Sequence, residues 1–163
     1  MVTERIGRKD GYTRKFLAIV DDTPECERAV FYAASRAAHT GGSLVLLYII
    51  EQGGFQHWLG VEEVMRAEAH EQAEAAFTKF TALARDRCQI EAERVIREGD
   101  AVDAIHQLTE DDQEIAILVL AAGSAKEGPG PLVSSIAGGS AAFPIPVTVV
   151  PANLSDEDIA ALS

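Results

Sequence analysis

The amino-acid sequence predicts an α/β fold, a single domain built on a doubly wound, five-stranded parallel sheet of order 3-2-1-4-5 with helices on both faces. Three observations support this prediction. Short apolar runs alternate with helix-like stretches along the chain, which implies parallel strands joined by right-handed crossovers. Several runs are apolar at nearly every position, as in strands buried on both faces. The length of 163 residues is enough to bury one sizeable core.

The first strand and helix are marked by a change from apolar residues to capping residues. The run KFLAIV at 15–20 predicts a strand, and the stretch TPECERAVFYAASRAAHTGG after it predicts a helix. Thr23 suits the N-cap, and Pro24 suits the first helical position. Gly41 and Gly42 end the helix. Its alanines recur at three- and four-residue steps and form a small-residue face that fits closely against a sheet.

The second strand and the second helix are also predicted from an apolar run followed by a helix-like stretch, and both are longer than the first pair. The run SLVLLYII at 43–50 is almost continuously apolar, which predicts a buried strand. A loop at 51–60 comes next. Residues 61–87 then place their apolar side chains along one side of a long helix.

The third strand has the pattern of a strand near a sheet edge. The run IEAERVIRE at 90–98 alternates between polar and apolar residues only in part. Gly99 breaks the run, and Asp100 caps a short third helix. The run EIAILVLAA at 114–122 then predicts another buried strand.

The last part of the chain opens with a loop rich in glycine and proline, GSAKEGPGPLVSS at 123–135. A short helix of small residues is expected near 132–142. The final strand is expected in IPVTVV at 145–150. The acidic tail at 152–163 has the composition of one weak turn or helix.

The composition excludes several classes of function. The chain has 26 acidic and 14 basic residues, a formal charge of −12, and no basic stripe, so nucleic acid is not an expected partner. No apolar run approaches the roughly 20 residues that cross a bilayer, so no membrane partner is expected. The polar start at 1–14 lacks the apolar core of a signal peptide. Because Cys26 and Cys88 also lack a paired spacing, we expect a cytoplasmic protein with reduced thiols.

The sequence contains no recognisable catalytic or metal-binding set. A metal cluster of His57, His70, Glu63 and Glu71 is not expected, because no histidine pair has four-residue spacing. The serines lack a G-x-S-x-G elbow, and no histidine is placed near Ser134 or a cysteine. We therefore expect at most slow hydrolysis of bound ATP rather than dedicated catalysis.

Three segments resemble the universal stress protein family. They are VDDTPECERAVFYAASRAA after the first strand, REGDAVDAI after the third, and LVLAAGS…PIPVTVVP at the end. The resemblance covers about residues 15–151, which leaves a lead-in at 1–14 and the tail at 152–163. It implies a dimeric stress-response module. Many members bind ATP or another adenine nucleotide, which would act as a regulatory ligand, and other members bind none.

The resemblance also implies where a nucleotide binds. Sheets of this kind take ligands at the carboxyl ends of their strands, where the winding reverses. Asp21 matches the aspartate that contacts the adenine end in the nucleotide-binding branch. Asp22 and Thr23 stand where that branch has Gly-Ser or a similar pair, so Asp22 adds a negative charge. Mg²⁺ or Mn²⁺ would bridge phosphate oxygens rather than occupy an all-protein cage. The candidate ligand-binding residues are Asp21, Asp22, Thr23, Ile50, Ala122, Gly123, Lys126, Gly128, Gly130, Ser134 and Ser135.

The loop after the fourth strand keeps the outline of the family's phosphate loop with two of its three anchors altered. The family pattern reads Gly, two residues, Gly, nine residues, then Gly-Ser or Gly-Thr. Counting from Gly123, Lys126 replaces the second glycine, and Ile-Ala at 136–137 replaces the last pair. In a loop two residues shorter, Ser134 and Ser135 take that last place, where they would cap the following helix.

These alterations leave two functions open. Gly128 and Gly130 supply backbone freedom inside the loop, and Lys126 supplies an ammonium group for a phosphate. Against this, Pro129 and Pro131 remove two backbone donors. The sequence therefore supports regulatory nucleotide binding and, as the alternative, a protein-interaction module of the same fold that binds no nucleotide.

The last strand predicts a homodimer. In the predicted order it lies at a sheet edge, and an uncovered apolar edge strand pairs readily with another strand. The resemblance implies that it pairs across a two-fold axis, with Val147, Val149 and Val150 in the apolar contact.

The loop FQHWLG at 55–60 holds Phe55, His57 and the only tryptophan, Trp58. It is either anchored against the next helix or acts as a lid or partner surface.

Overall fold

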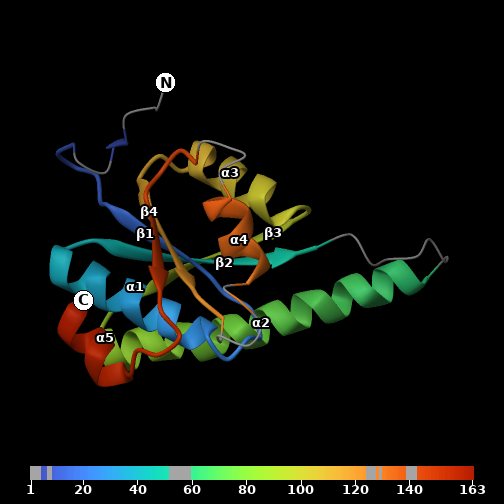
Figure 1. Ribbon diagram of the computed structural model, residues 1–163. Coiled ribbons are helices and arrows are strands. Elements are labelled where there is room, and N and C mark those ends of the chain that lie inside the picture. Colours follow the sequence, from blue (N-terminus) through green and yellow to red (C-terminus); the bar gives the residue numbers. More distant parts are fainter. Residues whose placement is uncertain (1–4, 7–8, 52–59, 124–127, 129, 139–142) are drawn as a thin grey trace.

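The chain forms one parallel sheet with helices between the strands (Figure 1). The computed structural model describes residues 5–6, 9–51, 60–123, 128, 130–138 and 143–163. The strands are β1 (Lys15–Ile19), β2 (Ser43–Ile50), β3 (Ala92–Glu98), β4 (Ile115–Ala121) and β5 (Val147–Val150). The helices are α1 (Cys26–Thr40), α2 (Val61–Cys88), α3 (Ala101–Asp111), α4 (Pro131–Ala137) and α5 (Asp156–Leu162). Neighbouring strands are parallel in the order β3-β2-β1-β4-β5, which confirms the predicted fold class.

Helices cover both faces of the sheet, as the doubly wound prediction requires (Figure 1). One core cluster joins the sheet to α1, α2 and α5 and contains Phe16 and Phe77. The other joins the sheet to α3 and α4 and contains Leu17 and Ile105. Phe16 and Leu17 are neighbours in β1 and point to opposite faces, because side chains alternate along a strand. The strand order reverses between β1 and β4, so their carboxyl ends flank the crevice in which such folds bind ligands.

Helix α1 begins later than the sequence predicts. Thr23 was expected at its N-cap, but Glu25 occupies that position and the first helical residue is Cys26. The reason is local, because the side chain of Asp21 accepts hydrogen bonds from Thr23 and holds 21–25 in a turn. The predicted end is correct, since Gly41 closes the helix with φ of 67°.

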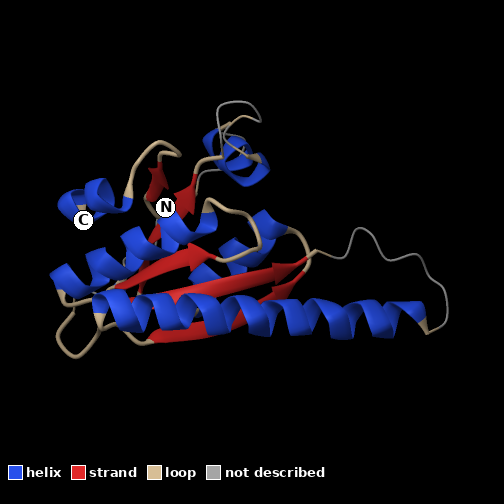
Figure 2. Cartoon of the chain, turned by 90° about the horizontal axis from the view of Figure 1, so that it is seen from below, coloured by secondary structure: helices blue, strands red, loops and turns tan. Residues whose placement is uncertain are grey.

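Helix α2 has 28 residues and is packed along only part of its length. Its buried residues all lie between Ala73 and Ala84. The first turns run beyond the ends of the strands, as Figure 2 shows. There Val61 and Val64 are exposed, and Arg66 pairs with Glu62 and with Glu98 of β3. Helix α2 is therefore a core helix in its second half and a projecting helix in its first half.

Helix α4 is short and is capped differently from the prediction. Ser134 and Ser135 were expected to cap it, but Gly130 is the N-cap and Pro131 is the first helical residue. The two serines lie inside the helix and are exposed. The positive φ of Gly130, 96°, favours glycine there, and proline suits the following position because its fixed φ matches the helix. The helix was predicted to reach residue 142, and it ends at Ala137. Residues 139–142 lie outside the described part of the chain.

The acidic tail forms a helix that packs against α1. Ser155 caps α5 by a reciprocal exchange of hydrogen bonds with Asp158. Ile159 is fully buried in the α1 side of the core. The Ser163 hydroxyl donates to the Ser35 hydroxyl at 2.5 Å, which ties the last residue to α1.

One lysine joins three segments at the amino ends of the strands. The Lys15 Nζ atom at the start of β1 lies 2.7 Å from Asp112, 3.1 Å from Glu93 and 3.2 Å from Glu114. Its side chain is only 16% exposed. Burial opposes the charged form of Lys15, but hydrogen bonds to the three carboxylates outweigh it and raise the pKa of the ammonium group.

Candidate functional site

A cavity of about 170 Å³ lies where the strand order reverses, between the carboxyl ends of β1 and β4. One wall is formed by the end of β1 and the start of α1, and the opposite wall by β4 and the start of α4. The lining residues are Ile19, Asp21, Thr23, Glu25, Cys26, Ala29, Leu120, Ala121, Gly130, Pro131, Leu132 and Val133. The walls are thus mostly apolar, and two carboxylates lie on the β1 side. This cavity is named the crevice below.

The β1 side of the crevice is built by a tight turn. Backbone pairing continues one residue past β1, where the Val20 amide donates to the Leu47 carbonyl at 2.8 Å. The Asp21 carboxylate then accepts from the Thr23 amide at 2.9 Å and from the Thr23 hydroxyl at 2.5 Å. This arrangement is the usual way in which an aspartate stabilises a turn two residues ahead. Asp21 is therefore fixed at the edge of the crevice with only part of its acceptor capacity in use.

The thiol of Cys26 forms part of the crevice lining. Its sulfur accepts from the Asp21 amide at 3.4 Å and donates to the Ile19 carbonyl at 3.6 Å. Burial raises the pKa of Cys26 to about 12, against the hydrogen bond from the Asp21 amide, which lowers it. Cys26 is consequently a neutral thiol at physiological pH.

The α4 side of the crevice combines two glycines of positive φ with two positions that have no free backbone donor. Gly128 and Gly130 both have positive φ, 79° and 96°, which is the backbone freedom expected of these two glycines. Pro131 has no N–H group. The Ser134 amide donates to the Gly130 carbonyl at 3.0 Å, so it is already used inside the helix.

The structure brings some of the sequence-predicted residues together and separates others. Asp21, Thr23 and Gly130 line the crevice. Ala122 and Gly123 follow the end of β4, where the Ala122 amide donates to the Val150 carbonyl at 2.9 Å. Among the other described candidates, Ser134 and Ser135 lie exposed on α4, Asp22 and Ile50 line other hollows, and Gly128 is not part of the crevice lining. Lys126 falls outside the described residues.

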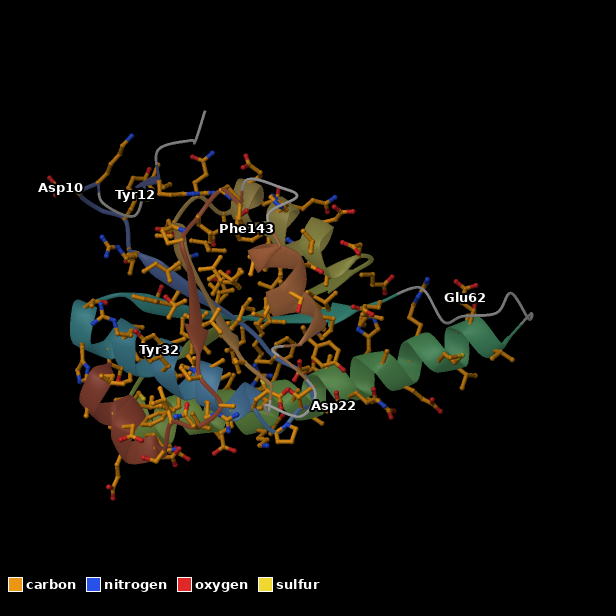
Figure 3. All side chains as sticks on the ribbon, in the orientation of Figure 1. Asp10, Tyr12, Asp22, Tyr32, Glu62 and Phe143 are labelled. Carbon is orange, nitrogen blue, oxygen red and sulfur yellow. The ribbon has the colours of Figure 1, made fainter. Side chains whose placement is uncertain are left out.

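A second hollow of about 350 Å³ lies on the opposite side of the same turn, against α2. Asp21 and Asp22 face Tyr48 of β2 and Lys79 of α2 across it. Figure 3 places Asp22 at the turn after β1, close to α2. Burial raises the pKa of the Tyr48 hydroxyl, and the charges of Asp22 and Asp21 add to this effect. Asp22 thus adds negative charge next to the crevice without lining it.

A third hollow of about 280 Å³ lies at the end of β2. Ile50 and Glu51 line it together with Met65 and other residues of α2. Beside it, His70 Nε2 lies 3.5 Å from the Glu98 carboxylate. His57 and Trp58 lie outside the described residues. Within the part of the chain that the structure describes, no group of three or more side chains could hold a metal ion.

Sequence reasoning missed several residues of the crevice. From the sequence, Glu25 is only part of the predicted first helix, Cys26 is an unpaired thiol, and Leu132 and Val133 are part of a loop or helix. One signal was available for the first pair, because the first turn of α1 directly follows β1 at the ligand-binding end of the sheet. No comparable signal marked the second pair, since the sequence does not show where the loop turns back.

The sequence comparison and the structure comparison point to the same protein family. A sequence model described as the universal stress protein family matches residues 13–151. None of the curated proteins compared with the chain matches it. Among the described residues, no helix is long and apolar enough to cross a membrane.

Solved structures of low sequence identity share the fold. Universal stress protein UspA from Lactobacillus plantarum is 18% identical, with a TM-score of 0.70 over 85% of this chain and 97% of that chain. A universal stress protein in complex with cAMP is 20% identical, with a TM-score of 0.57 over 85% of this chain and 97% of that one. The universal stress protein from Archaeoglobus fulgidus in complex with dAMP is 16% identical, with a TM-score of 0.59 and the same coverage, 85% and 97%.

Proposed function

Because the chain belongs to the universal stress protein family, we propose that it is a regulatory module that binds an adenine nucleotide in the crevice between β1 and β4. The observation that carries this proposal is the crevice itself. It combines apolar walls with a fixed carboxylate, Asp21, at the point where the strand order reverses. The relatives solved with cAMP and with dAMP support the choice of an adenine ligand.

The residues of the crevice have separate roles in this proposal. Ile19, Leu120 and Val133 form the apolar surfaces against which a base packs. The Asp21 carboxylate accepts hydrogen bonds from the base or the ribose, because Thr23 occupies only part of its acceptor capacity. Gly123 extends the site toward the loop that also holds Lys126.

Phosphates of a nucleotide would project away from the apolar walls, toward that loop and the exposed side chains of Ser134 and Ser135. Mg²⁺ or Mn²⁺ would accompany the phosphates and offset part of their charge. The proposed role is binding rather than catalysis.

We propose that the protein acts as a homodimer in the cytoplasm. Strand β5 lies at the edge of the sheet, and Val149 is 39% exposed. Val147 is half-buried beside it, while Val150 is buried inside the protomer. A pairing through this edge would therefore bury Val147 and Val149, with Val150 anchoring the strand from within. The free thiols of Cys26 and Cys88 fit a reducing compartment.

The experiment that tests nucleotide binding begins with freshly purified protein and no added ligand. The protein is denatured, and the supernatant is analysed for adenine nucleotides. Calorimetric titration of the emptied protein with ATP and Mg²⁺, AMP and cAMP then follows. Asp21→Ala is expected to weaken binding at least tenfold, and Asp10→Ala, which changes an exposed carboxylate outside the crevice, serves as the control. Absence of bound nucleotide together with no heat at millimolar ligand would contradict the proposal.

One observation favours the second candidate, an interaction module of the same fold. An apolar groove of about 320 Å³ runs beside β5 and is lined by Leu120, Val133, Ile136, Ala137, Phe143, Val147 and Val149. Apolar grooves next to an edge strand are typical of protein contacts. If nucleotide binding is absent while the dimer forms, this second function is the one supported.

A further inference from the structure

We propose that the crevice selects among adenine ligands by charge, and that Glu25 is one of the residues that sets this selectivity. An uncharged or singly charged ligand, such as an adenine nucleoside or its cyclic monophosphate, would bind more tightly than a triphosphate. This inference rests on the proposed function and adds the class of ligand to it.

The charged side chains among the described residues that line the crevice all have the same sign. Asp21 and Glu25 contribute two carboxylates, and none of the described residues that line the cavity is a lysine, arginine or histidine. Asp22 lies one residue away and faces the neighbouring hollow, where the cation is Lys79. The whole chain carries a formal charge of −12. A triphosphate brings several negative charges into this field, whereas a nucleoside brings none.

The size of the crevice agrees with a small neutral occupant. Its volume is about 170 Å³. A dry cavity of about 150 Å³ holds one benzene ring, and sites for drug-sized ligands span about 300–1,000 Å³. The enclosed part of the crevice therefore fits one ring system, and any phosphate lies outside the apolar walls. A triphosphate then gains little from burial while its charges remain near Asp21 and Glu25.

At two described positions, the α4 wall has no free backbone donor for a phosphate. Sites for phosphate chains use several free backbone amides or cationic side chains. Pro131 has no amide proton, and the Ser134 amide is bonded to Gly130 at 3.0 Å. Helix α4 itself has only seven residues, so its dipole is small.

The pKa of the Cys26 thiol also depends on the charges around the crevice. Burial is the main reason for its raised pKa, and the hydrogen bond from the Asp21 amide lowers it. Among the nearby charges, Asp21 raises the pKa most, Lys79 lowers it, and Glu25 raises it least. Both carboxylates thus act against a negative charge at the cavity wall, and Lys79 offsets part of their effect. They disfavour a ligand phosphate near the same wall for the same reason.

Glu25 is suited to a selectivity test because its side chain makes no capping hydrogen bond. Glu25→Gln removes one charge and keeps the shape, and Glu27→Gln removes the same charge from the same turn of α1 outside the cavity lining. Calorimetry would compare adenosine, cAMP, AMP and ATP, with and without Mg²⁺, for the wild type and both variants. Thermal melting would check that each variant is folded.

Adenosine and cAMP are expected to bind at least tenfold more tightly than ATP. Glu25→Gln is expected to tighten ATP binding about threefold to tenfold with little change for adenosine. Glu27→Gln should leave the ratio of adenosine affinity to ATP affinity unchanged. Added salt should lower this ratio in the wild type, because it screens the repulsion of ATP. If ATP binds more tightly than the other ligands, with or without Mg²⁺, the proposed selection by charge is wrong, while the proposed function is still supported. An unchanged ratio in folded Glu25→Gln would overturn the role of Glu25, and no binding of any ligand would overturn the proposed function as well.

Discussion

The carboxylate of Asp21 accepts two hydrogen bonds from Thr23, one from its amide at 2.9 Å and one from its hydroxyl at 2.5 Å. These bonds fix the turn between β1 and α1 and orient Asp21 at the edge of the crevice. They also explain why α1 starts at Cys26. The position of the proposed ligand-binding carboxylate therefore depends on a residue that need not touch the ligand.

Replacing Thr23 by valine should weaken binding of an adenine ligand. Thr23→Val removes the hydroxyl bond and keeps the amide bond, so Asp21 loses one of its two local partners. We expect a threefold to tenfold loss of affinity by calorimetry and a loss of stability of about 1 kcal/mol or less, because the bond is exposed. Thr78→Val is the matched control, since it removes an exposed hydroxyl bond on α2 at a residue that does not line the crevice. Equal affinities for both variants would argue against a positioning role for Thr23.

The buried thiol of Cys26 should make the protein less stable in alkaline solution. The folded pKa of Cys26 is about 12, while an unfolded cysteine loses its proton near pH 8.5. Between these values the unfolded state binds fewer protons, so the free energy of unfolding falls as pH rises, by up to about 1.4 kcal/mol per pH unit. Denaturant unfolding between pH 8 and pH 10.5 should show this decline.

The matched variants are Cys26→Ala and Cys88→Ala. The slope contributed by Cys26 should disappear in the first and persist in the second. If the wild type and Cys26→Ala lose stability in parallel over this range, the thiol is not held in its neutral form.

The Lys15 cluster should contribute measurably to stability. Lys15→Met leaves Glu93, Asp112 and Glu114 without their shared cation, and we expect a loss of about 1.5–3 kcal/mol in urea unfolding at pH 7. Because the folded pKa of Lys15 is raised, this contribution is complete below about pH 10.4, the unfolded value, and is lost only at higher pH. The difference should therefore be the same at pH 6 and pH 9.

Arg85→Met provides the comparison for Lys15→Met, because Arg85 pairs with Asp86 at 3.7 Å on the exposed surface. That change should cost less than about 0.5 kcal/mol. Similar losses for the two variants would show that Lys15 acts as another surface charge.

The tail helix should stabilise the domain through one side chain. Ile159→Ala removes a fully buried side chain from the cluster against α1, and we expect a loss of about 2–4 kcal/mol by thermal or denaturant unfolding. Leu162→Ala in the same helix removes a side chain that is 63% exposed and should cost less than about 0.5 kcal/mol. If Ile159→Ala is as stable as Leu162→Ala, α5 is not packed on α1 in solution.

The proposed dimer contact predicts a specific change of mass. Val149→Lys places a charge on the exposed edge of β5 and should convert the dimer into a monomer in sedimentation or light scattering. Val64→Lys changes another exposed valine, on the projecting part of α2, and should leave the dimer intact. A monomeric wild type, or a dimer that survives Val149→Lys, would contradict the interface.

The sequence was sufficient to predict the fold because each strand and most helices carry their own local signals. Runs such as 43–50 and 114–122 are apolar throughout, and Gly41 ends α1 as predicted. The capping residues of two helices were predicted wrongly because tertiary geometry competed with capping preference. Thr23 is used by Asp21, and the α4 cap falls at Gly130, ahead of the two serines.

The candidate site was predictable mainly on its β1 side, and Gly130 is the predicted residue that lines the described crevice from the α4 side. Asp21 follows a buried strand at the end where ligands bind, so topology alone places it correctly. Leu132 and Val133 could not be placed in the same way, because the path of the intervening loop determines which residues face β1. Glu25 belongs to the stretch predicted as the first helix, and its place in the crevice lining is visible only in three dimensions.

The uneven packing of α2 has a consequence for how the helix opens. Its buried residues begin at Ala73, and the turns before that residue are held mainly by backbone bonds and by surface pairs such as Glu62–Arg66. Local unwinding from the first turn therefore exposes little apolar surface and costs little free energy. Amide hydrogens should exchange fastest near Val61 and progressively more slowly toward Phe77, so that a single helix displays a gradient of protection from fraying to global unfolding.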